Sequence, residues 1–184
     1  MFRKTDIPPD FYSFESNQPF EYCIECGENL VATQAPYFVE KAYRKYPDFK
    51  AHDVVYEFAM CFSCANKMRQ TLSAESVVAL QNFIENNTNK STARTTSEHS
   101  GLEECLITRQ PIQDQEEYVI YGVFQGDQMM VADFPYAIGM DAMNQLSELL
   151  SNATLDIMDD FMGKYFTGPP EINELITPRR PVLI

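Results

Sequence analysis

The chain has 184 residues, of which 27 are acidic and 14 are Lys or Arg, so its formal net charge is −13. Its hydrophobic content of 45% is ordinary for a globular protein, and its length allows one domain or two small ones. The negative charge argues against nucleic-acid binding, which needs a basic face, and no apolar run is long enough to span a membrane.

The N-terminal extension, residues 1–19, has no apolar signal core near its start. Five cysteines in a chain without such a signal suit a reducing compartment, where thiols stay free for metal. A cytoplasmic location is therefore the default expectation.

The first cysteine pair lies in the segment 23–27, whose sequence is CIECG. Gly27 can adopt the left-handed backbone conformation that a tight metal-binding turn needs. The second pair, Cys61 and Cys64, stands at the start of an expected helix that carries Ala65, Met68 and Leu72 on one face. The helix dipole at that end favours the thiolate form of both cysteines.

Two β-rich segments, residues 36–43 and 53–60, separate the cysteine pairs. The polar stretch 44–52, which contains Pro47, is expected to connect them as a loop. Residues 20–73 therefore predict a knuckle, a β-hairpin and a helix in that order.

Two CxxC pairs supply four soft ligands, and a two-residue gap lets both sulfur atoms of a pair reach one ion. The sequence thus predicts one structural Zn²⁺ bound by Cys23, Cys26, Cys61 and Cys64. Four unrelated buried thiols, an iron site and a redox-active pair are the alternatives. Redox work usually needs a thioredoxin-like βαβ context, which is absent, and Cys64-Ala65 lacks the second knuckle glycine of a rubredoxin-like iron site.

The order knuckle, hairpin, helix resembles the treble-clef zinc finger over roughly residues 20–73. The resemblance is carried by the four cysteines, Gly27 and the helix after Cys64. It implies zinc and the treble-clef fold, but it does not choose among the protein-binding, nucleic-acid-binding and catalytic roles of such fingers.

A second copy of this pattern is expected later in the chain. Residues 59–83 align without a gap with residues 137–161, and upstream Cys23 aligns with Cys105. In each copy a serine, Ser73 or Ser151, is the expected N-cap of a further helix.

The metal ligands are lost from the second copy, because Cys26, Cys61 and Cys64 align with residues that cannot bind zinc. Those residues are Thr108, Gly139 and Ala142. The remaining Cys105 is expected to be an ordinary buried cysteine. A metal-free unit of this size has a marginal core, so we expect it to dock on the first copy and fold with it.

The predicted fold class is α+β, with two treble-clef-like repeats of which only the first is zinc-bound. The expected domains are an extension (1–19), a zinc-binding repeat (20–85), a polar linker (86–102), a metal-free repeat (103–166) and a Pro-rich tail (167–184).

Function is predicted less specifically than fold. We expect a non-enzymatic protein-interaction or scaffold module, because no catalytic constellation or phosphate-binding loop is visible. Residues 101–184 hold 14 acidic and 4 basic residues, which suits a basic partner protein. The alternative is nucleic-acid binding through the first hairpin, whose basic residues are Lys41, Arg44, Lys45 and Lys50.

Overall fold

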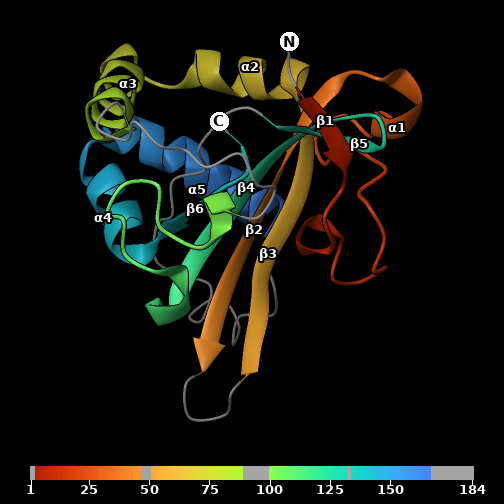
Figure 1. Ribbon diagram of the computed structural model, residues 1–184. Helices are drawn as coiled ribbons and strands as arrows, with labels where there is room; N and C mark the ends of the chain where they lie inside the picture. Colours follow the sequence, from red (N-terminus) through yellow and green to blue (C-terminus); the bar gives the residue numbers. More distant parts are fainter. Residues whose placement is uncertain (1–2, 47–50, 89–99, 132–133, 167–184) are drawn as a thin grey trace.

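The computed structural model describes residues 3–46, 51–88, 100–131 and 134–166. Within them the chain forms a mixed α+β fold with five α-helices and an antiparallel sheet (Figure 1). The strands are β1 (Arg3–Asp6), β2 (Pro36–Tyr46), β3 (Ala51–Cys61), β4 (Glu117–Gln125), β5 (Gln128–Val131) and β6 (Tyr136–Gly139). The helices are α1 (Leu30–Thr33), α2 (Phe62–Thr71), α3 (Ala74–Thr88), α4 (Met140–Glu148) and α5 (Asn152–Phe166). Short 3-10 turns are η1 (Pro9–Phe11), η3 (Ser100–Leu102) and η4 (Ile112–Asp114).

One sheet contains strands from both the N-terminal and the C-terminal part of the chain. Its strand order is β1-β5-β4-β2-β3, with β6 pairing beside β5 on the same edge of β4. The central contact is the antiparallel pair β2–β4, which runs in register from Pro36↔Gln125 to Arg44↔Glu117. Strands from residues 36–61 and residues 117–139 therefore share a single hydrogen-bonded layer.

The hairpin β2–β3 is longer than the sequence predicts. Residues 44–52 were expected to form a loop, but β2 continues to Tyr46 and β3 begins at Ala51. The prediction is wrong for residues 44–46 and 51–52, while residues 47–50 lie outside the described residues. Arg44 lies opposite both Asp53 and Glu117, so its strand conformation is held from two sides. A register shift between Ala42 and Tyr43 interrupts the regular pairing of β2 with β3, whereas β2 stays paired with β4 as far as Arg44.

Residues 20–85 are called the first half below, and residues 103–166 the second half. Where the first half has the single strand β3, the second half has two short strands, β5 and β6. After β4 the chain turns at Gly126, and β5 pairs with only Phe124 and Gln125 before it leaves to pair with β1. The segment β6 then pairs with residues 118–121 of β4. The N-terminal extension thus contributes a strand that completes the sheet next to the second half.

Backbone pairing in the two halves follows the same register. Tyr37↔Cys61 in β2–β3 corresponds to Tyr118↔Gly139 in β4–β6. Across the central pair, Tyr37↔Phe124 and Tyr43↔Tyr118 are related by exchanging the halves, and both centre on Glu40↔Tyr121. The pairing between the halves is therefore approximately two-fold symmetric in register.

The helices α3 and α5 show the same approximate two-fold symmetry as the strands. Both α3 and α5 have 15 residues, and each begins after a serine whose hydroxyl accepts from a backbone N–H three residues later. These are the N-caps expected at Ser73 and Ser151. Between the helices the contacts are reciprocal, because Ser73 N donates to Thr154 Oγ1 (3.0 Å) and Ser151 N donates to Ser76 Oγ (2.9 Å).

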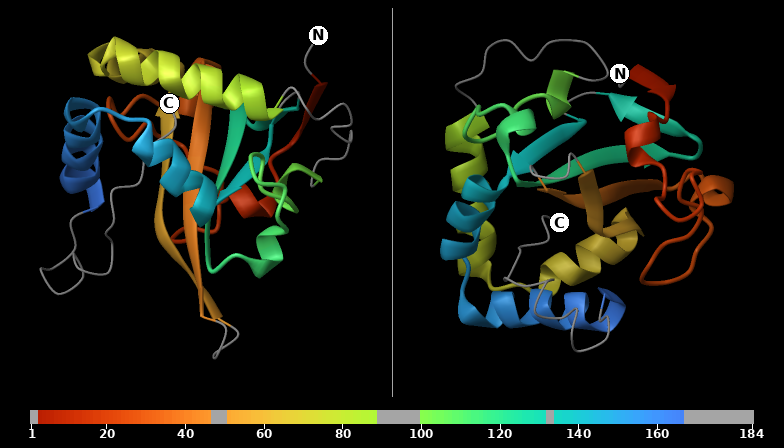
Figure 2. Two further views of the ribbon diagram at one scale, coloured as in Figure 1. Left: turned by 90° about the vertical axis from the view of Figure 1, so that its left-hand side faces the viewer. Right: turned by 90° about the horizontal axis from the view of Figure 1, so that it is seen from below.

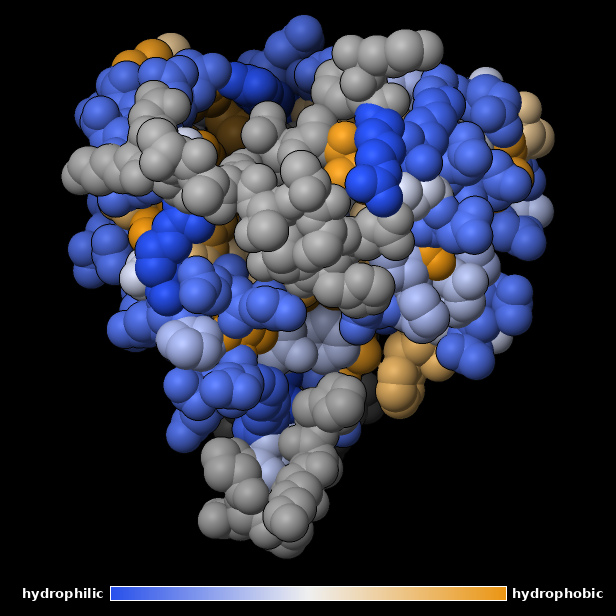
Figure 3. Space-filling view, viewed as in Figure 1, coloured by the Kyte–Doolittle hydropathy of each residue, from blue (hydrophilic) through white to orange (hydrophobic). Residues whose placement is uncertain are grey.

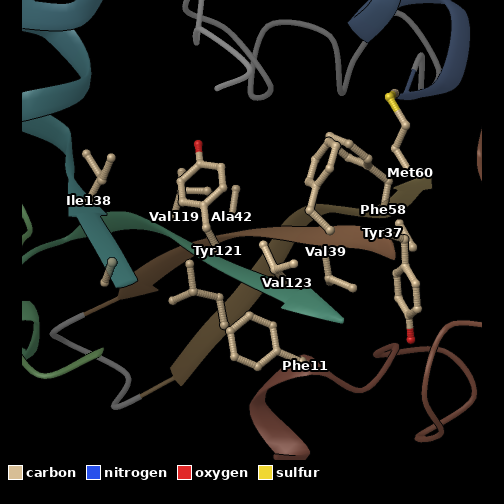
Figure 4. Packing of buried hydrophobic residues seen from close by; sticks show 14 of the residues in the cluster. Phe11, Tyr37, Val39, Ala42, Phe58, Met60, Val119, Tyr121, Val123 and Ile138 are labelled. Carbon is tan, nitrogen blue, oxygen red and sulfur yellow. The ribbon is translucent and has the colours of Figure 1, made fainter. Parts of the chain in front are cut away.

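Both faces of the sheet are covered. Helices α2 to α5 lie on one side, while η1 and the N-terminal segment lie on the other (Figure 2). Phe11 of η1 is 1% exposed and meets the Phe124 ring edge-on, with the ring centroids 5.2 Å apart. Figure 4 shows Phe11 reaching the sheet on the side opposite the Tyr121 ring. The N-terminal extension is thus part of the core.

A buried ion pair holds that extension in place. The Lys41 ammonium lies 3.2 Å from Glu57 Oε2 and also donates to the backbone oxygen of Tyr12. Glu57 Oε1 in turn accepts from the Ser13 hydroxyl (3.0 Å) and the Phe14 N–H (2.8 Å). Because a buried charge needs a partner, this network fixes the course of the chain over the sheet.

On the helix-covered face, Glu40 is a fully buried carboxyl at the centre of the β2–β4 pair. Its Oε1 accepts a hydrogen bond from the Tyr56 hydroxyl at 2.6 Å. Burial raises the pKa of Glu40 to about 8, although Tyr56 and Tyr121 act in the opposite direction. The carboxyl is therefore mostly protonated at neutral pH.

Several sequence predictions fall outside the described residues. The tail 167–184 is one, and Lys50 is another; of the linker 86–102, only its two ends are described, with α3 continuing to Thr88. Among the described residues, no helix is both long enough and apolar enough to cross a membrane.

Candidate metal centre

The first wall of the centre is the knuckle 23–28. Cys23 N donates to Glu28 O (3.0 Å) and Gly27 N donates to Cys23 O (2.9 Å), closing a tight turn. Gly27 has φ +69°, and no heavy atom lies within 4 Å of the position where a Cβ would stand. Glycine is thus favoured here by the left-handed backbone and not by lack of space for a side chain.

The second wall is formed by the end of β3 and the start of α2. Cys61 is the N-cap of α2, and Cys64 lies within the first turn of that helix. The two walls are joined because Ile24 N donates to Ala59 O (2.9 Å) and Cys61 N donates to Cys23 Sγ (3.4 Å). Residues 38 positions apart in the chain therefore share one small volume.

The four sulfur atoms of Cys23, Cys26, Cys61 and Cys64 lie within 4.8 Å of one another. The Cys26 and Cys61 sulfur atoms are 3.9 Å apart. Four thiolates around a tetrahedral zinc, each about 2.3 Å from the metal, stand about 3.8 Å apart. The four cysteines are placed to bind a metal ion, and their donor set suits a thiophilic one such as zinc.

The protein environment shifts the pKa values of these thiols in different directions. Burial tends to raise the pKa of Cys23, but hydrogen bonds from the backbone N–H groups of Cys61, Cys26 and Glu25 outweigh it and lower the pKa overall. For Cys61 and Cys64 burial dominates and raises the pKa. The protein environment thus favours ionisation of Cys23 over that of Cys61 and Cys64. A bound cation would favour the thiolate form of its ligands.

The knuckle also contacts the last turn of α5. Glu25, between the two knuckle cysteines, pairs with Lys164 (Oε1–Nζ 3.0 Å) and accepts from the Tyr165 hydroxyl (Oε2, 2.5 Å). The Tyr165 and Lys164 bonds lower the pKa of Glu25. Nothing in the sequence pointed to this contact, because its residues are 139 and 140 positions apart.

The second half has a backbone frame of the same design. Cys105 N donates to Gln110 O (2.8 Å), Arg109 N donates to Cys105 O (3.0 Å), and Leu106 N donates to Ala137 O (2.8 Å). Arg109 has φ +62°, like Gly27 in the first knuckle. Cys105 is fully buried, and its sulfur accepts from Gly139 N at 3.4 Å.

The basic residues of the first hairpin are engaged within the fold. Lys41 is buried against Glu57, Arg44 bonds Glu117 (2.5 Å), and Lys45 donates to Ile112 O (2.6 Å). Tyr43, an aromatic residue of the same hairpin, is buried and stacks on Tyr118 with centroids 5.0 Å apart, so its ring is not available to stack on bases. The three described basic residues therefore do not form a free cationic patch.

An acidic hollow lies beside the second knuckle. Its volume is about 650 Å³. The lining residues are Gln110, Pro111, Asp114, Gln115, Glu116, Glu117, Met140 and Asp141. The acidic character of this half is evident from the sequence, but only the fold brings the end of η4 and the start of α4 together around one hollow.

The chain matches no protein-family model, and no curated protein or solved structure is significantly similar to it.

Proposed function

We propose that the protein is a zinc-stabilised, non-enzymatic interaction module. The observation that carries this proposal is the set of four cysteine sulfur atoms within 4.8 Å of one another. A closed set of four protein ligands leaves no position on the metal for a substrate, which is typical of structural zinc sites. The ion would hold the knuckle against β3 and α2.

Zinc is preferred to iron in this proposal. The second cysteine pair opens the helix α2, and Cys64 is followed by Ala65 where a rubredoxin-like site has glycine. A reducing compartment such as the cytoplasm would keep all four thiols available for the ion.

The proposed architecture is two treble-clef-like repeats, residues 20–85 and 103–166, of which only the first binds metal. The matching knuckle bonds, the matching register of β2–β3 and β4–β6, and the reciprocal contacts of Ser73 and Ser151 support it. In this arrangement residues 86–102 link the repeats, and residues 1–19 and 167–184 flank them.

The proposed partner is a basic protein segment bound by the second half. Residues 101–184 carry 14 acidic and 4 basic residues, and the acidic hollow presents Asp114, Glu116 and Asp141 at its surface. The described side chains on the face of Figure 3 are mostly hydrophilic, with apolar residues scattered among them. Such a surface favours a charged partner over an apolar one.

Metal analysis tests the first part of the proposal. Freshly purified, reduced full-length protein should contain one equivalent of zinc, and a Cys61→Ser variant should contain none. Less than half an equivalent in the wild-type protein, or unchanged zinc in the variant, would contradict it.

Peptide titration tests the second part. A synthetic Lys-rich peptide should bind the full chain in a salt-dependent manner, whereas a Glu-rich peptide and a DNA duplex should not. Asp114→Lys/Asp141→Lys should abolish this binding, while the matched charge change Asp156→Lys/Asp160→Lys on α5 should weaken it only slightly. Equal loss in both variants would reduce the effect to net charge, and preferential DNA binding would favour the nucleic-acid alternative.

A further inference from the structure

The knuckle of the first half contacts a helix that belongs to the second half. Glu25 lies between Cys23 and Cys26, and its carboxylate meets two consecutive residues in the last turn of α5. The Lys164 ammonium lies 3.0 Å from Glu25 Oε1, and the Tyr165 hydroxyl donates to Oε2 at 2.5 Å. Both oxygens of a carboxylate that stands between two of the four clustered cysteines are therefore bonded to α5.

This contact has no equivalent on the other side of the molecule. Alignment of the knuckles places Ile107, a buried apolar residue, where the first half has Glu25. Alignment of the two 15-residue helices places Asn87 where α5 has Tyr165, and the Asn87 amide donates to Phe83 O within its own helix. The contact is thus not part of the approximate two-fold framework, and it occurs at the knuckle that carries the cysteine cluster.

The last turn of α5 is also anchored on the sheet. The ring centroid of Phe166 lies 5.5 Å from that of Tyr56 and 6.0 Å from that of Phe58, both on β3. The Tyr165 ring packs on Phe161 one turn earlier, with the centroids 5.1 Å apart. The end of the helix is therefore held between the knuckle on one side and β3 on the other.

Binding of a metal would change the electrostatics of this contact. Four thiolates around one divalent ion carry a net negative charge, and the Glu25 carboxylate adds a further negative charge beside them. Lys164 is the cation that α5 places against that carboxylate. Opposite charges attract, so an occupied site holds Lys164 more strongly than four neutral thiols do. Because coupling between two binding events is reciprocal, docking of Lys164 in turn favours retention of the metal.

We propose that Lys164 and Tyr165 are positioning residues for the metal centre, which hold the knuckle through Glu25 and couple zinc binding in the first half to docking of α5. This inference rests on the proposed zinc site. The second half, which has no four-cysteine set of its own, thereby contributes to metal retention in the first half.

The test is the rate at which the full-length, zinc-loaded protein releases zinc to an excess of a chromophoric chelator. Lys164→Met/Tyr165→Phe should release zinc about fivefold faster than the wild-type protein, which is the effect expected of one exposed charged pair. Lys164→Arg should keep the wild-type rate, because the guanidinium retains the positive charge. Lys4→Met removes an exposed lysine from β1 and is the matched control for net charge, with an unchanged rate.

Hydrogen exchange gives the reciprocal measurement. Chelation should speed amide exchange in the last turn of α5 more in the wild-type protein than in Lys164→Met/Tyr165→Phe, because only the wild-type contact responds to the metal. The last turn of α3, which makes no equivalent contact with a knuckle carboxylate, should respond equally in both proteins.

The outcomes separate this proposal from the proposed function. Equal release rates from the wild-type protein and the folded double variant would overturn the coupling and leave the zinc site standing. Equally fast release from Lys4→Met would reduce the effect to net charge and overturn it too. A wild-type protein that binds no zinc would refute the proposed function and the coupling with it.

A smaller change covers the case in which the double variant does not fold. Tyr165→Phe removes one hydroxyl and keeps the ring that packs on Phe161. It should still release zinc about twofold faster than the wild-type protein, since one bond to Glu25 is lost and the ion pair remains. An unchanged rate in this folded variant would contradict the proposal.

Discussion

In residues 23–72 and residues 105–150 a knuckle, strands and a helix meet through the same backbone hydrogen bonds, yet only the first set surrounds four thiols. The second places Gly139 and Ala142 where the first has Cys61 and Cys64. The difference teaches that the backbone frame does not depend on metal where a sheet and helices support it. In the second half that support comes from β4, which pairs with β2, β5 and β6.

Removing Cys61, one of the four proposed zinc ligands, should have the largest effect on this comparison. Structural zinc contributes roughly 10–16 kcal/mol of apparent binding free energy, as much as the whole stability of a typical domain. Because β2 pairs with β4 along its length, Cys61→Ser or chelation should expose the amides of residues 117–125 as well. Hydrogen exchange with and without chelator measures this.

Persistent protection of residues 117–125 after complete zinc removal would show that the halves are stable independently. The first half alone should then lose its protection.

Glu40, at the centre of the β2–β4 pair, should make the stability of the protein depend strongly on pH. The equivalent position of the second half, Tyr121, has no carboxyl group and should have no such effect. Glu40 has a folded-state pKa of about 8 against an ordinary 4.5, so the folded state keeps a proton that the unfolded state loses. Stability should therefore fall by about 1.4 kcal/mol per pH unit as pH rises from about 4.5 to about 8. Glu40→Gln should remove this slope and keep the acceptor for Tyr56.

Urea unfolding of wild type and variant at several pH values from 5 to 8 gives the difference between the slopes. Tyr121→Phe is the matched control, because Tyr121 holds the equivalent place in the second half and its change leaves the buried carboxyl present. A wild-type slope equal to that of Glu40→Gln would refute the assignment.

The contact between the starts of α3 and α5 provides a test in which the two halves should behave alike. Equivalent substitutions on the two sides are expected to lower the stability by equal amounts. Ser76→Ala removes the acceptor for Ser151 N, and Thr154→Val removes the acceptor for Ser73 N. Both Ser76 and Thr154 are fully buried, so each change should cost about 1–2 kcal/mol. Chemical unfolding of the two variants measures both costs, and a difference above about 2 kcal/mol would argue against a symmetric junction.

The smallest effect is expected at Cys105. If the four-cysteine cluster binds zinc as proposed, Cys105→Ser should retain all of it. The variant should lose only about 1 kcal/mol of stability, because a buried thiol is replaced by a smaller, more polar hydroxyl. Its counterpart Cys23→Ser should lose the zinc. Metal analysis and thermal unfolding of the pair test the contrast, and zinc loss in Cys105→Ser would place that residue at the metal.

The sequence by itself determined the local features of this protein. Ligand spacing, the glycine after Cys26 and the N-cap serines depend on residues within a few positions of one another, so the four-cysteine cluster and the starts of α3 and α5 could be predicted. The alignment of residues 59–83 with residues 137–161 also agrees with the matching places of Cys61 in β2–β3 and Gly139 in β4–β6.

Only the tertiary structure decided which charges are free and which strands lie side by side. Lys41 and Arg44 look like a basic patch in the sequence, but their partners, Glu57 and Glu117, come from other strands. Glu40 looks like a solvent-facing acid in an alternating strand, but both faces of β2 are covered, one by helices and the other by the N-terminal segment. Burial and pairing depend on contacts between distant segments, and the periodicity of one strand carries no information about what covers its second face.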